Sequence, residues 1–287
     1  MQTTVRVILT LFFVISAVIL GWSTVNYYFF SPWTRDARVT ADVVTIAPDV
    51  SGYVTEVRVR NNQFVKRGEI LFVIDQDRYR LALSDAEAAL AARLAQKQML
   101  LSQLERREKL KPGAVIAVED LDNSHRQAQS AAAQYDQASA SRDTAALNLA
   151  RTEVRASVNG YVTNLLLTQG SYAAQGKAVL ALIDSDSYRV DAYFEETKIP
   201  QIKLDAPVDV QLMDGAAMIK GKVESIARGI TDQDNKDGPE LLANVNPTFT
   251  WVRLAQRIPV RIRLTNVPAD VLIAAGMTCT VTLKNEI

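Results

Sequence analysis

Residues 46–79 read IAPDVSGYVTEVRVRNNQFVKRGEILFVIDQDRY, and residues 154–188 read VRASVNGYVTNLLLTQGSYAAQGKAVLALIDSDSY. Both stretches contain Gly-Tyr-Val-Thr, and both end in the pattern Leu-x-x-Ile-Asp-x-Asp-x-Tyr. An internal repeat is a stronger indication of a fold than any local signal. The two copies therefore predict two halves of one β-unit that a long insertion separates. This arrangement favours a device that projects part of the chain, and it argues against a catalytic pocket.

Each copy of the repeat alternates apolar and polar residues in short runs, which predicts strands. Glycines divide these runs and predict turns, because glycine adopts backbone conformations that other residues avoid. The glycines expected at these turns are Gly52, Gly68, Gly160 and Gly176. A first β-strand with one half-motif is expected over residues 36–77, and the second half-motif over residues 153–187.

The insertion between the copies is rich in Ala, Leu, Gln, Arg and Glu, all of which favour helices. Leucines recur at seven-residue spacing in its first half, and Leu121, Ala128, Tyr135, Arg142 and Leu149 do so in its second half. Lys111-Pro112-Gly113 breaks the pattern near the middle, since proline and glycine end helices. Residues 78–152 therefore predict an antiparallel coiled-coil hairpin with its turn near residues 111–115. Its reach is roughly 50 Å at about 1.5 Å per residue.

The N-terminus is the one compositional outlier. Residues 7–30 contain no charged residue, and a stretch of about 20 apolar residues spans a bilayer core. Aromatic residues cluster at its far end, where an interfacial belt forms. A cleaved signal peptide is the alternative, but the apolar run exceeds the usual length and no clear cleavage site follows. Residues 1–35 therefore predict a single transmembrane anchor, with the bulk of the chain outside the cytoplasm.

The C-terminal part returns to short alternating runs, at residues 188–193, 208–212, 260–264 and 278–283. Regularly spaced strands of this kind predict a small barrel or sandwich. Residues 188–287 are therefore expected to form a β-barrel, with a polar surface loop over residues 232–247. The predicted fold class is mixed α and β and elongated: a transmembrane helix, a split lipoyl-like β-sandwich, an α-helical coiled-coil hairpin and a C-terminal β-barrel.

Composition and motifs argue against catalysis and nucleic-acid binding. The 32 basic and 32 acidic residues of the chain cancel, so no global field attracts an anionic polymer. His125 is the only histidine, which excludes histidine clusters for a metal or a nucleophile. Residues 232–243 resemble a calcium loop, but Lys236 stands where an oxygen ligand is needed and Ala243 stands where glutamate is needed. Cys279 lies in a strand pattern and is expected to be buried. The chain is predicted not to be an enzyme.

Each copy of the repeat resembles one half of a biotinyl/lipoyl domain. The first copy fits the family pattern at Pro48, Gly52, Val54, Val65, Gly68, Leu71, Ile74 and Asp75. Such domains carry their cofactor on a lysine at an exposed turn. Here Arg78 and Ser187 occupy the two equivalent turns, and neither can form the amide link. No cofactor is therefore expected, and the helical insertion starts at the first of these turns.

A split lipoyl unit with a helical hairpin, an anchor and a barrel resembles a membrane fusion protein, the periplasmic adaptor of the HlyD/EmrA type. Two strings support this resemblance: SPWTRDAR at residues 31–38 and WVRLAQRIPVRI at residues 251–262. Glu195-Glu196-Thr197-Lys198 adds to them. Within the family, the chain is most similar to adaptor subunits of p-hydroxybenzoic acid (aromatic carboxylic acid) efflux pumps.

The resemblance implies a subunit of a tripartite pump in the bacterial inner membrane, single-pass, with most of the chain in the periplasm. Its implied partners are an inner-membrane exporter of the aromatic acid or major facilitator type, a TolC-like outer-membrane channel and further copies of itself, as a trimer or hexamer. The implied channel contacts at the hairpin tip are Arg106, Arg107 and Leu110, and the implied barrel motif is Trp251, Arg253, Gln256 and Arg257. Ala117 replaces the serine of the usual tip pattern, and Ser157 and Asn159 replace the usual proline and aspartate of the second copy.

Two other functions remain open from the residues alone. A membrane-anchored structural or signalling protein of the cell envelope would also use a projecting coiled coil, with a different partner. A lipoyl-type carrier component would show a mass increment on a lysine. Capture of a partner from the hairpin tip separates the adaptor from the first alternative, and intact mass spectrometry tests the second.

Overall fold

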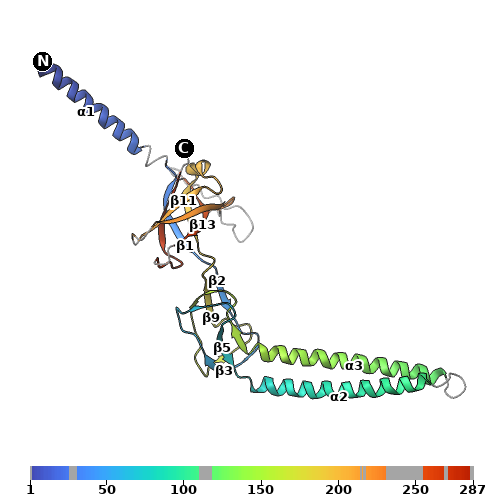
Figure 1. The fold of residues 1–287 in the computed structure, drawn as a ribbon. Coiled ribbons are helices and arrows are strands. Elements are labelled where there is room, and N and C mark those ends of the chain that lie inside the picture. Colours follow the sequence, from blue (N-terminus) through green and yellow to red (C-terminus); the bar gives the residue numbers. More distant parts are fainter. Residues whose placement is uncertain are drawn as a thin grey trace, which may run out of the picture. The chain divides into compact units, whose positions relative to one another are not determined.

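The computed structural model of the chain describes residues 2–25, 31–109, 118–213, 215, 218–230, 255–267 and 271–284. The chain divides into two compact units. One unit comprises Met1–Asp42 and Ser187–Ile287, and the other comprises Val43–Asp186. The second unit is thus an insertion within the sequence of the first. As predicted, the fold is mixed α and β, with a barrel, a sandwich and a pair of long helices (Figure 1).

The second unit contains two four-stranded sheets that form the predicted sandwich. One sheet has the order β2 (Val43–Ile46), β9 (Leu180–Asp184), β7 (Gly160–Thr163) and β4 (Phe64–Val65). The other has the order β6 (Glu153–Arg155), β5 (Ile70–Ile74), β3 (Gly52–Val57) and β8 (Tyr172–Ala173). Each sheet takes two strands from either side of the helical insertion. Neither half of the repeat can therefore complete a sheet without the other.

The repeat in the sequence becomes a pseudo-two-fold symmetry in the sandwich. Backbone N–H groups of each copy donate to carbonyl groups of the other copy at equivalent places. The equivalent pairs are Val54 to Ser171 (2.8 Å) and Val162 to Gln63 (3.0 Å), and Gly68 to Ala156 (2.8 Å) and Gly176 to Pro48 (3.0 Å). These reciprocal bonds hold the two halves together, because each joins the backbone of one copy to the backbone of the other.

The core of the sandwich comes from the alternating apolar positions of both copies. Side chains with 0 or 1% exposure include Val54, Leu71, Phe72 and Ile74 from the first copy and Val162 and Leu182 from the second. Aromatic residues cover the outside in two equivalent edge-to-face pairs, Tyr53 with Tyr172 and Phe64 with Tyr161, each with ring centroids 5.3 Å apart. The period-two alternation of burial is what the strand pattern of the sequence predicts.

The four glycines of the half-motifs have two different structural roles. Gly68 and Gly176 lie in turns, with φ +86° and φ +74°. Glycine adopts this left-handed region without steric cost. Gly52 and Gly160 are the first residues of β3 and β7, which differs from the turns expected for them. Their lack of a side chain matters for packing. A Cβ on Gly160 would lie 2.0 Å from the Ile183 carbonyl oxygen, whereas a Cβ on Gly52 would lie 2.7 Å from the Ile74 side chain.

Two long helices form the insertion, α2 (Asp77–Glu108) and α3 (Val118–Ala150). They run antiparallel and side by side, with Arg107 against Ser124 near one end and Arg93 against Gln134 further along (Figure 1). Their interface is thin, since α2 has no buried residue and α3 has only Ser124, Ala128 and Ala131. The coiled-coil packing stays a prediction, and the predicted turn at residues 111–115 lies outside the described residues.

The helices are tied to the sandwich at their base by polar contacts. Thr152, which is fully buried, accepts a hydrogen bond on its backbone oxygen from the Ile74 N–H (2.9 Å). Its hydroxyl accepts another from the Gln76 side-chain amide (2.9 Å). Arg78 and Tyr79 both donate to the Ser51 carbonyl oxygen at 2.8 Å. Arg78, at the turn where a carrier domain has its lysine, thus anchors the first helix to the sandwich.

The first unit contains a closed barrel of six antiparallel strands. Its order is β1 (Trp33–Thr40), β10 (Arg189–Glu195), β13 (Arg257–Asn266), β12 (Ile219–Ile226), β11 (Pro207–Leu212) and β14 (Thr278–Leu283). A short 3₁₀ helix, η2 (Glu196–Gln201), follows β10. The sequence predicts that residues 36–40 belong with the first half-motif. That prediction is wrong, because β1 pairs with β10 and β14 and so belongs to the barrel. β12 was not among the expected strands.

Cys279 lies in the barrel core and is 1% exposed. Burial raises the pKa of its thiol from the ordinary 9.0 to about 11. At pH 8 the thiolate fraction is then about 100-fold lower than in the unfolded chain, and the thiolate is the reactive form. We expect labelling of this single cysteine by a thiol reagent at pH 8 to be at least ~100-fold slower before unfolding than after it. Equal rates in native buffer and in denaturant would contradict the described barrel core.

Before the barrel, α1 (Gln2–Val25) carries exposed apolar side chains, among them Phe12, Phe13, Ile19 and Trp22. In the part of the chain that the structure describes, no helix meets the length and apolarity needed to cross a membrane. The anchor expected over residues 7–30 stays a prediction, and residues 26–30 lie outside the described residues.

Candidate functional site at one end of the barrel

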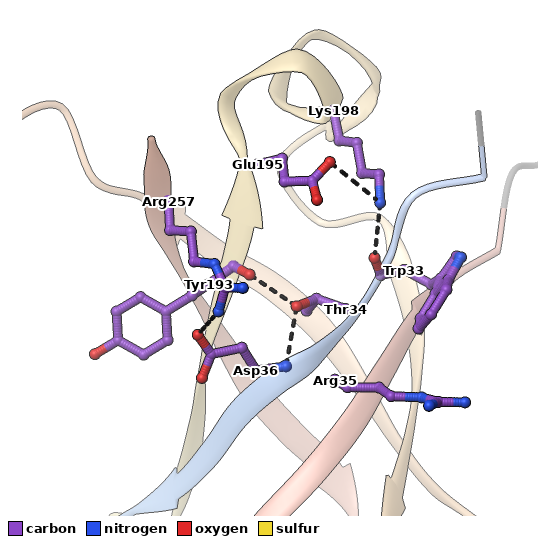
Figure 2. A pocket seen from close by; sticks show the side chains of 8 residues that line it. All are labelled: Trp33, Thr34, Arg35, Asp36, Tyr193, Glu195, Lys198 and Arg257. Atoms are coloured by element: carbon purple, nitrogen blue, oxygen red, sulfur yellow. Dashed lines mark hydrogen bonds and ion pairs between the residues drawn. The ribbon is translucent and has the colours of Figure 1, made fainter. Parts of the chain in front are cut away.

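Three segments that are far apart in the sequence meet at one end of the barrel (Figure 2). They are the start of β1, the end of β10 with the helix η2 that follows it, and the start of β13. Together they surround a pocket of about 560 Å³. We name this site the barrel-end pocket, and its lining residues are Trp33, Thr34, Arg35, Asp36, Tyr193, Glu195, Lys198 and Arg257.

Thr34 shapes the pocket by holding an irregularity in β1. The pairing of β1 with β14 shifts register between Thr34 and Ala37, as in a β-bulge. The Thr34 hydroxyl donates to the Tyr193 carbonyl oxygen at 2.8 Å and accepts from the Asp36 N–H at 3.1 Å (Figure 2). Bulges re-aim side chains at the ends of barrels. Here the exposed Arg35 and the half-buried Asp36 both line the pocket.

Asp36 and Arg257 form an ion pair across β10, which lies between β1 and β13 in the barrel. Their side chains are 40% and 59% exposed. Solvent screens an ion pair this open, so it stabilises the barrel by about 0–1 kcal/mol. Its main effect is positional, because it occupies the Asp36 carboxylate and orients the Arg257 guanidinium at the wall of the pocket.

Lys198 is the most enclosed charged group of the pocket, with 9% of the residue exposed. Its ammonium lies 3.4 Å from the Trp33 carbonyl oxygen and 3.7 Å from a Glu195 carboxylate oxygen. It also lies 5.5 Å from the centroid of the Trp33 ring, and the Arg35 guanidinium carbon lies 5.4 Å from the same centroid. Trp33 is therefore flanked by two cations within the usual range of cation–π contacts.

We expect Thr34→Val to destabilise the barrel by about 1–3 kcal/mol, because it leaves the Asp36 N–H without its partner in a partly buried site. Thr34 is 8% exposed, so water does not freely replace the hydroxyl. Thr40→Val is the matched control on the same strand, since the Thr40 hydroxyl is only half-buried and its contacts are longer, at 3.2 and 3.5 Å. Thermal unfolding of both variants checks the difference, and equal melting temperatures would contradict this role of Thr34.

Two residues of the expected barrel motif, Gln256 and Arg257, are described by the structure and lie at or beside this site. Arg257 lines the pocket, and the Gln256 carbonyl oxygen accepts a hydrogen bond from the Glu196 N–H at 2.9 Å. Trp251 and Arg253 lie outside the described residues. Thr34 and Lys198 were not among the expected site residues. Thr34 lies within the string SPWTRDAR, and Lys198 lies within Glu195-Glu196-Thr197-Lys198, so both belong to segments that carry the family resemblance. Their convergence at one site depends on closure of the barrel, which the sequence does not indicate.

Two of the expected channel contacts, Arg106 and Arg107, lie in the last turn of α2. Arg106 is exposed in the last turn of α2. Arg107 contacts α3, where its guanidinium donates to the Ser124 hydroxyl and, at 3.4 Å, to the Asp120 carbonyl oxygen. The contact of both arginines with a channel stays a prediction. Leu110 and Ala117 lie outside the described residues. Arg106 and Arg107 are both exposed, and the Arg107 guanidinium is engaged by α3, so Arg106 is the better placed of the two to contact a partner.

The described residues contain no group of three His, Cys, Asp or Glu side chains placed to hold a metal ion. His125 lies on α3 with its ring nitrogen 3.2 Å from a Glu108 carboxylate oxygen, so it takes part in a contact between the helices. The calcium-like stretch at residues 232–243 lies outside the described residues.

Comparisons with known proteins agree with this architecture. Residues 42–185 match the family described as RND MFP, barrel-sandwich hybrid domain, and residues 187–284 match the AAEA-like beta-barrel domain. YdhJ of Escherichia coli strain K12, an uncharacterized protein, is 39% identical over 278 residues, which cover 97% of each chain. The chain therefore belongs to the membrane fusion proteins, the family of periplasmic adaptors, which are not enzymes.

Solved structures share the fold at low identity. The membrane fusion protein Spr0693 of Streptococcus pneumoniae R6 is 15% identical, with a TM-score of 0.64, and the match covers 90% of this chain and 100% of that one. The periplasmic adaptor protein EmrA is 18% identical, with a TM-score of 0.50, and the match covers 88% of this chain and 98% of that one. These likenesses concern the fold alone.

Proposed function

We propose that the chain is the periplasmic adaptor of a tripartite efflux pump and links an inner-membrane exporter to an outer-membrane channel. The observation that carries this proposal is the insertion of α2 and α3 into the split sandwich. The helices start directly after β5 and end directly before β6. The contacts of Gln76, Arg78 and Thr152 fix the helices to the sandwich. The two helices have similar lengths, with 32 residues in α2 and 33 residues in α3. At about 1.5 Å per residue, such a pair is suited to reach a partner roughly 50 Å away.

The proposal places the chain in the bacterial inner membrane as a single-pass protein with its bulk in the periplasm. Support comes from α1, where large apolar side chains are widely exposed, such as Phe12 at 68% and Trp22 at 75%. Exposed apolar surface of this extent needs a lipid or protein environment. The sequence from residue 7 to residue 30, without a charged residue, is long enough for a lipid one.

The proposal also includes self-association as a trimer or hexamer. The paired helices bury few side chains between them, and apolar residues remain exposed along both. Among these are Leu81 (72%), Met99 (47%), Leu101 (43%) and Leu147 (49%). A thin pair of helices gains stability by packing against neighbouring copies, since most helical stability in proteins comes from tertiary packing.

The proposed substrates are small aromatic acids or other toxic organic compounds. This part of the proposal is supported by the sequence resemblance to adaptors of aromatic carboxylic acid pumps and by the AAEA-like description that the barrel matches. The exporter partner would be of the aromatic acid or major facilitator type, and the channel would be TolC-like.

Deletion of the gene tests the proposed function. We expect the deletion strain to accumulate, and to grow poorly with, at least one small organic acid, and we expect a plasmid copy of the chain to restore growth. The readouts are intracellular concentration and minimum inhibitory concentration across a panel of aromatic acids and unrelated toxic compounds. Unchanged tolerance and unchanged accumulation across the whole panel would contradict a role in export.

A further inference from the structure

The outer face of the barrel carries cations that lie directly opposite one another. Strands β12, β13 and β10 are neighbours, and their register aligns Lys222 with Arg263 and Arg263 with Arg189. The adjacent row on the same strands belongs to the buried core: Val223, Ile262 and Val190. Side chains alternate between the two faces of a strand, so the three cations share the outer face. Lys222 and Arg263 are exposed, and Arg189 is half-buried.

This alignment of cations costs stability. Directly opposite side chains in an antiparallel pair have Cβ atoms about 4.5–5.5 Å apart, and like charges there destabilise the sheet. Arg189 is compensated by Asp42, whose carboxylate oxygen lies 2.8 Å from the guanidinium. Lys222 and Arg263 form no ion pair within the described parts of the chain. The barrel therefore keeps two aligned cations that it does not itself neutralise.

A second row adds cations to the same face. Arg261, Asp191 and Arg38 lie directly opposite one another across β13, β10 and β1. Asp191 lies 3.5 Å from Arg261, whereas the exposed Arg38 forms no ion pair with the described residues. We name the two rows together the basic face, and its cations are Arg38, Arg189, Lys222, Arg261 and Arg263. The carboxylates on or beside these rows are Asp42, Asp191 and Glu224.

The mixture of charges favours a protein as the partner of the basic face. A nucleic acid or an anionic lipid surface presents phosphates, which Asp191 between its two arginines and the exposed Glu224 would repel. A protein surface can place carboxylates at Lys222, Arg263 and Arg38 and hydrogen-bond donors at the acidic positions. The planar guanidinium of arginine also matches a carboxylate with two parallel donors. Carboxylates of a protein are therefore the groups that fit this face.

A second copy of the barrel offers few such carboxylates. The described strands of the barrel contain five carboxylates, at Asp36, Asp191, Glu195, Asp209 and Glu224. Four of the five already pair with cations of the same chain. Among these strands, Glu224 alone is left without an ion pair. Charge complementarity therefore favours a different protein over a second copy.

We propose that the basic face docks on a carboxylate-bearing surface of a different protein, with Asp or Glu side chains of that protein at Lys222, Arg263 and Arg38. This inference rests on the proposed function and assigns one of the two partners of the adaptor to the barrel. The paired helices belong to the sandwich unit, whereas β1 of the barrel follows α1 in the chain. Within the proposed pump, the partner of the basic face is therefore the inner-membrane exporter.

Photocrosslinking in living cells from position 225 tests this docking. Ser225 is exposed and uncharged and lies directly opposite Arg261, so a photoreactive residue there samples the basic face and keeps its cations. Position 211, exposed on β11 opposite Thr280, is the control outside the face. We expect position 225, and not position 211, to capture an inner-membrane protein, with the crosslinked peptide identified by mass spectrometry. Capture of no such protein, of another copy of this chain or of phospholipid would overturn the proposal, and so would equal capture from both positions.

Lys222→Gln combined with Arg263→Gln separates docking from folding. We expect this double variant to lower the crosslink yield from position 225 at least about ten-fold, because charge-assisted contacts are lost. We expect its melting temperature to be unchanged or higher, since like charges that lie directly opposite are removed. Arg228→Gln is the matched control, because Arg228 is exposed just beyond β12 and belongs to neither row. An unchanged yield, or a lower yield together with a lower melting temperature, would overturn the proposal.

A charge exchange tests the carboxylates of the captured protein. Each Asp or Glu of the crosslinked peptide is replaced by lysine, alone and together with Arg263→Glu. We expect a lysine at the contact to lower the crosslink yield and Arg263→Glu to restore part of it, because the exchanged pair attracts again. A crosslinked peptide without any carboxylate, or no restoration by Arg263→Glu, would exclude the proposed contact.

Failure of this inference and failure of the proposed function give different results. A double variant that restores tolerance in the deletion strain and keeps its crosslinks removes the basic face from the mechanism and leaves the adaptor role. A chain that crosslinks through the basic face but changes neither tolerance nor accumulation of any compound keeps the docking surface and loses the role in export.

Discussion

Gly160→Ala is expected to lower the melting temperature of the sandwich unit by about 10 °C, which corresponds to about 3 kcal/mol of lost stability. The added Cβ would lie 2.0 Å from the Ile183 carbonyl oxygen and 2.8 Å from its carbonyl carbon. These are backbone atoms of β9, so no side-chain rotation relieves the clash. The strands β7 and β9 must separate, although Gly160 and Asp184 are directly paired across them.

Gly52→Ala is the matched control for this substitution, because Gly52 is the equivalent residue in the first copy of the repeat. Its added Cβ would lie 2.7 Å from the Ile74 Cγ2 atom, which is the end of a side chain and can shift. We expect a loss of about 1 kcal/mol, at the lower end of the cost of overpacking a core. Thermal unfolding followed by circular dichroism compares the two variants, and equal losses would contradict the described packing of β7 against β9.

Removal of most of the paired helices is expected to abolish export while the rest of the protein stays folded. The variant replaces residues 84–146 by a short Gly/Ser loop and keeps the base contacts of Gln76, Arg78 and Thr152. Because α2 has no buried residue and α3 has only three, their removal takes little core from the sandwich. We therefore expect tolerance to fall to that of the deletion strain, with a nearly unchanged melting temperature.

Gln96→Ala is the control for the excision, since Gln96 is exposed near the middle of α2 and leaves the length of the helices unchanged. We expect it to support full tolerance. Circular dichroism confirms that the excised variant keeps its β-signal and loses helical signal. Full tolerance with the excised variant would mean that the helices are not needed for export, which would contradict the proposed mechanism.

The sandwich and the helical insertion could be predicted because their signals are local or repeated. The matching Gly-Tyr-Val-Thr segments define equivalent strands, and Lys111-Pro112-Gly113 interrupts a helical composition at its middle. The role of β1 could not be predicted in the same way. Its alternating pattern indicates a strand but does not specify which strands pair with it. Its partners are β10, which follows the whole inserted unit, and β14, which lies close to the C-terminus.

The same limit applies to individual residues. Gly52 and Gly160 stand in identical Gly-Tyr-Val-Thr segments, yet one faces a side chain and the other a backbone carbonyl. The sequence does not indicate that the Arg107 guanidinium donates to Ser124 on the neighbouring helix. The barrel-end pocket joins Thr34, Lys198 and Arg257 from segments that only the closed barrel brings together. Such non-local convergence leaves no periodic signal in a single sequence.

Site-specific photocrosslinking from the end of α2 in living cells tests the adaptor role most directly. A photoreactive residue at position 106, which is exposed in the last turn of α2, is compared with one at position 96 near the middle of the helix. The adaptor role predicts that position 106 captures an outer-membrane channel protein, identified by mass spectrometry, and that position 96 does not. Capture of only cytoplasmic or peptidoglycan-associated partners from position 106 would contradict it.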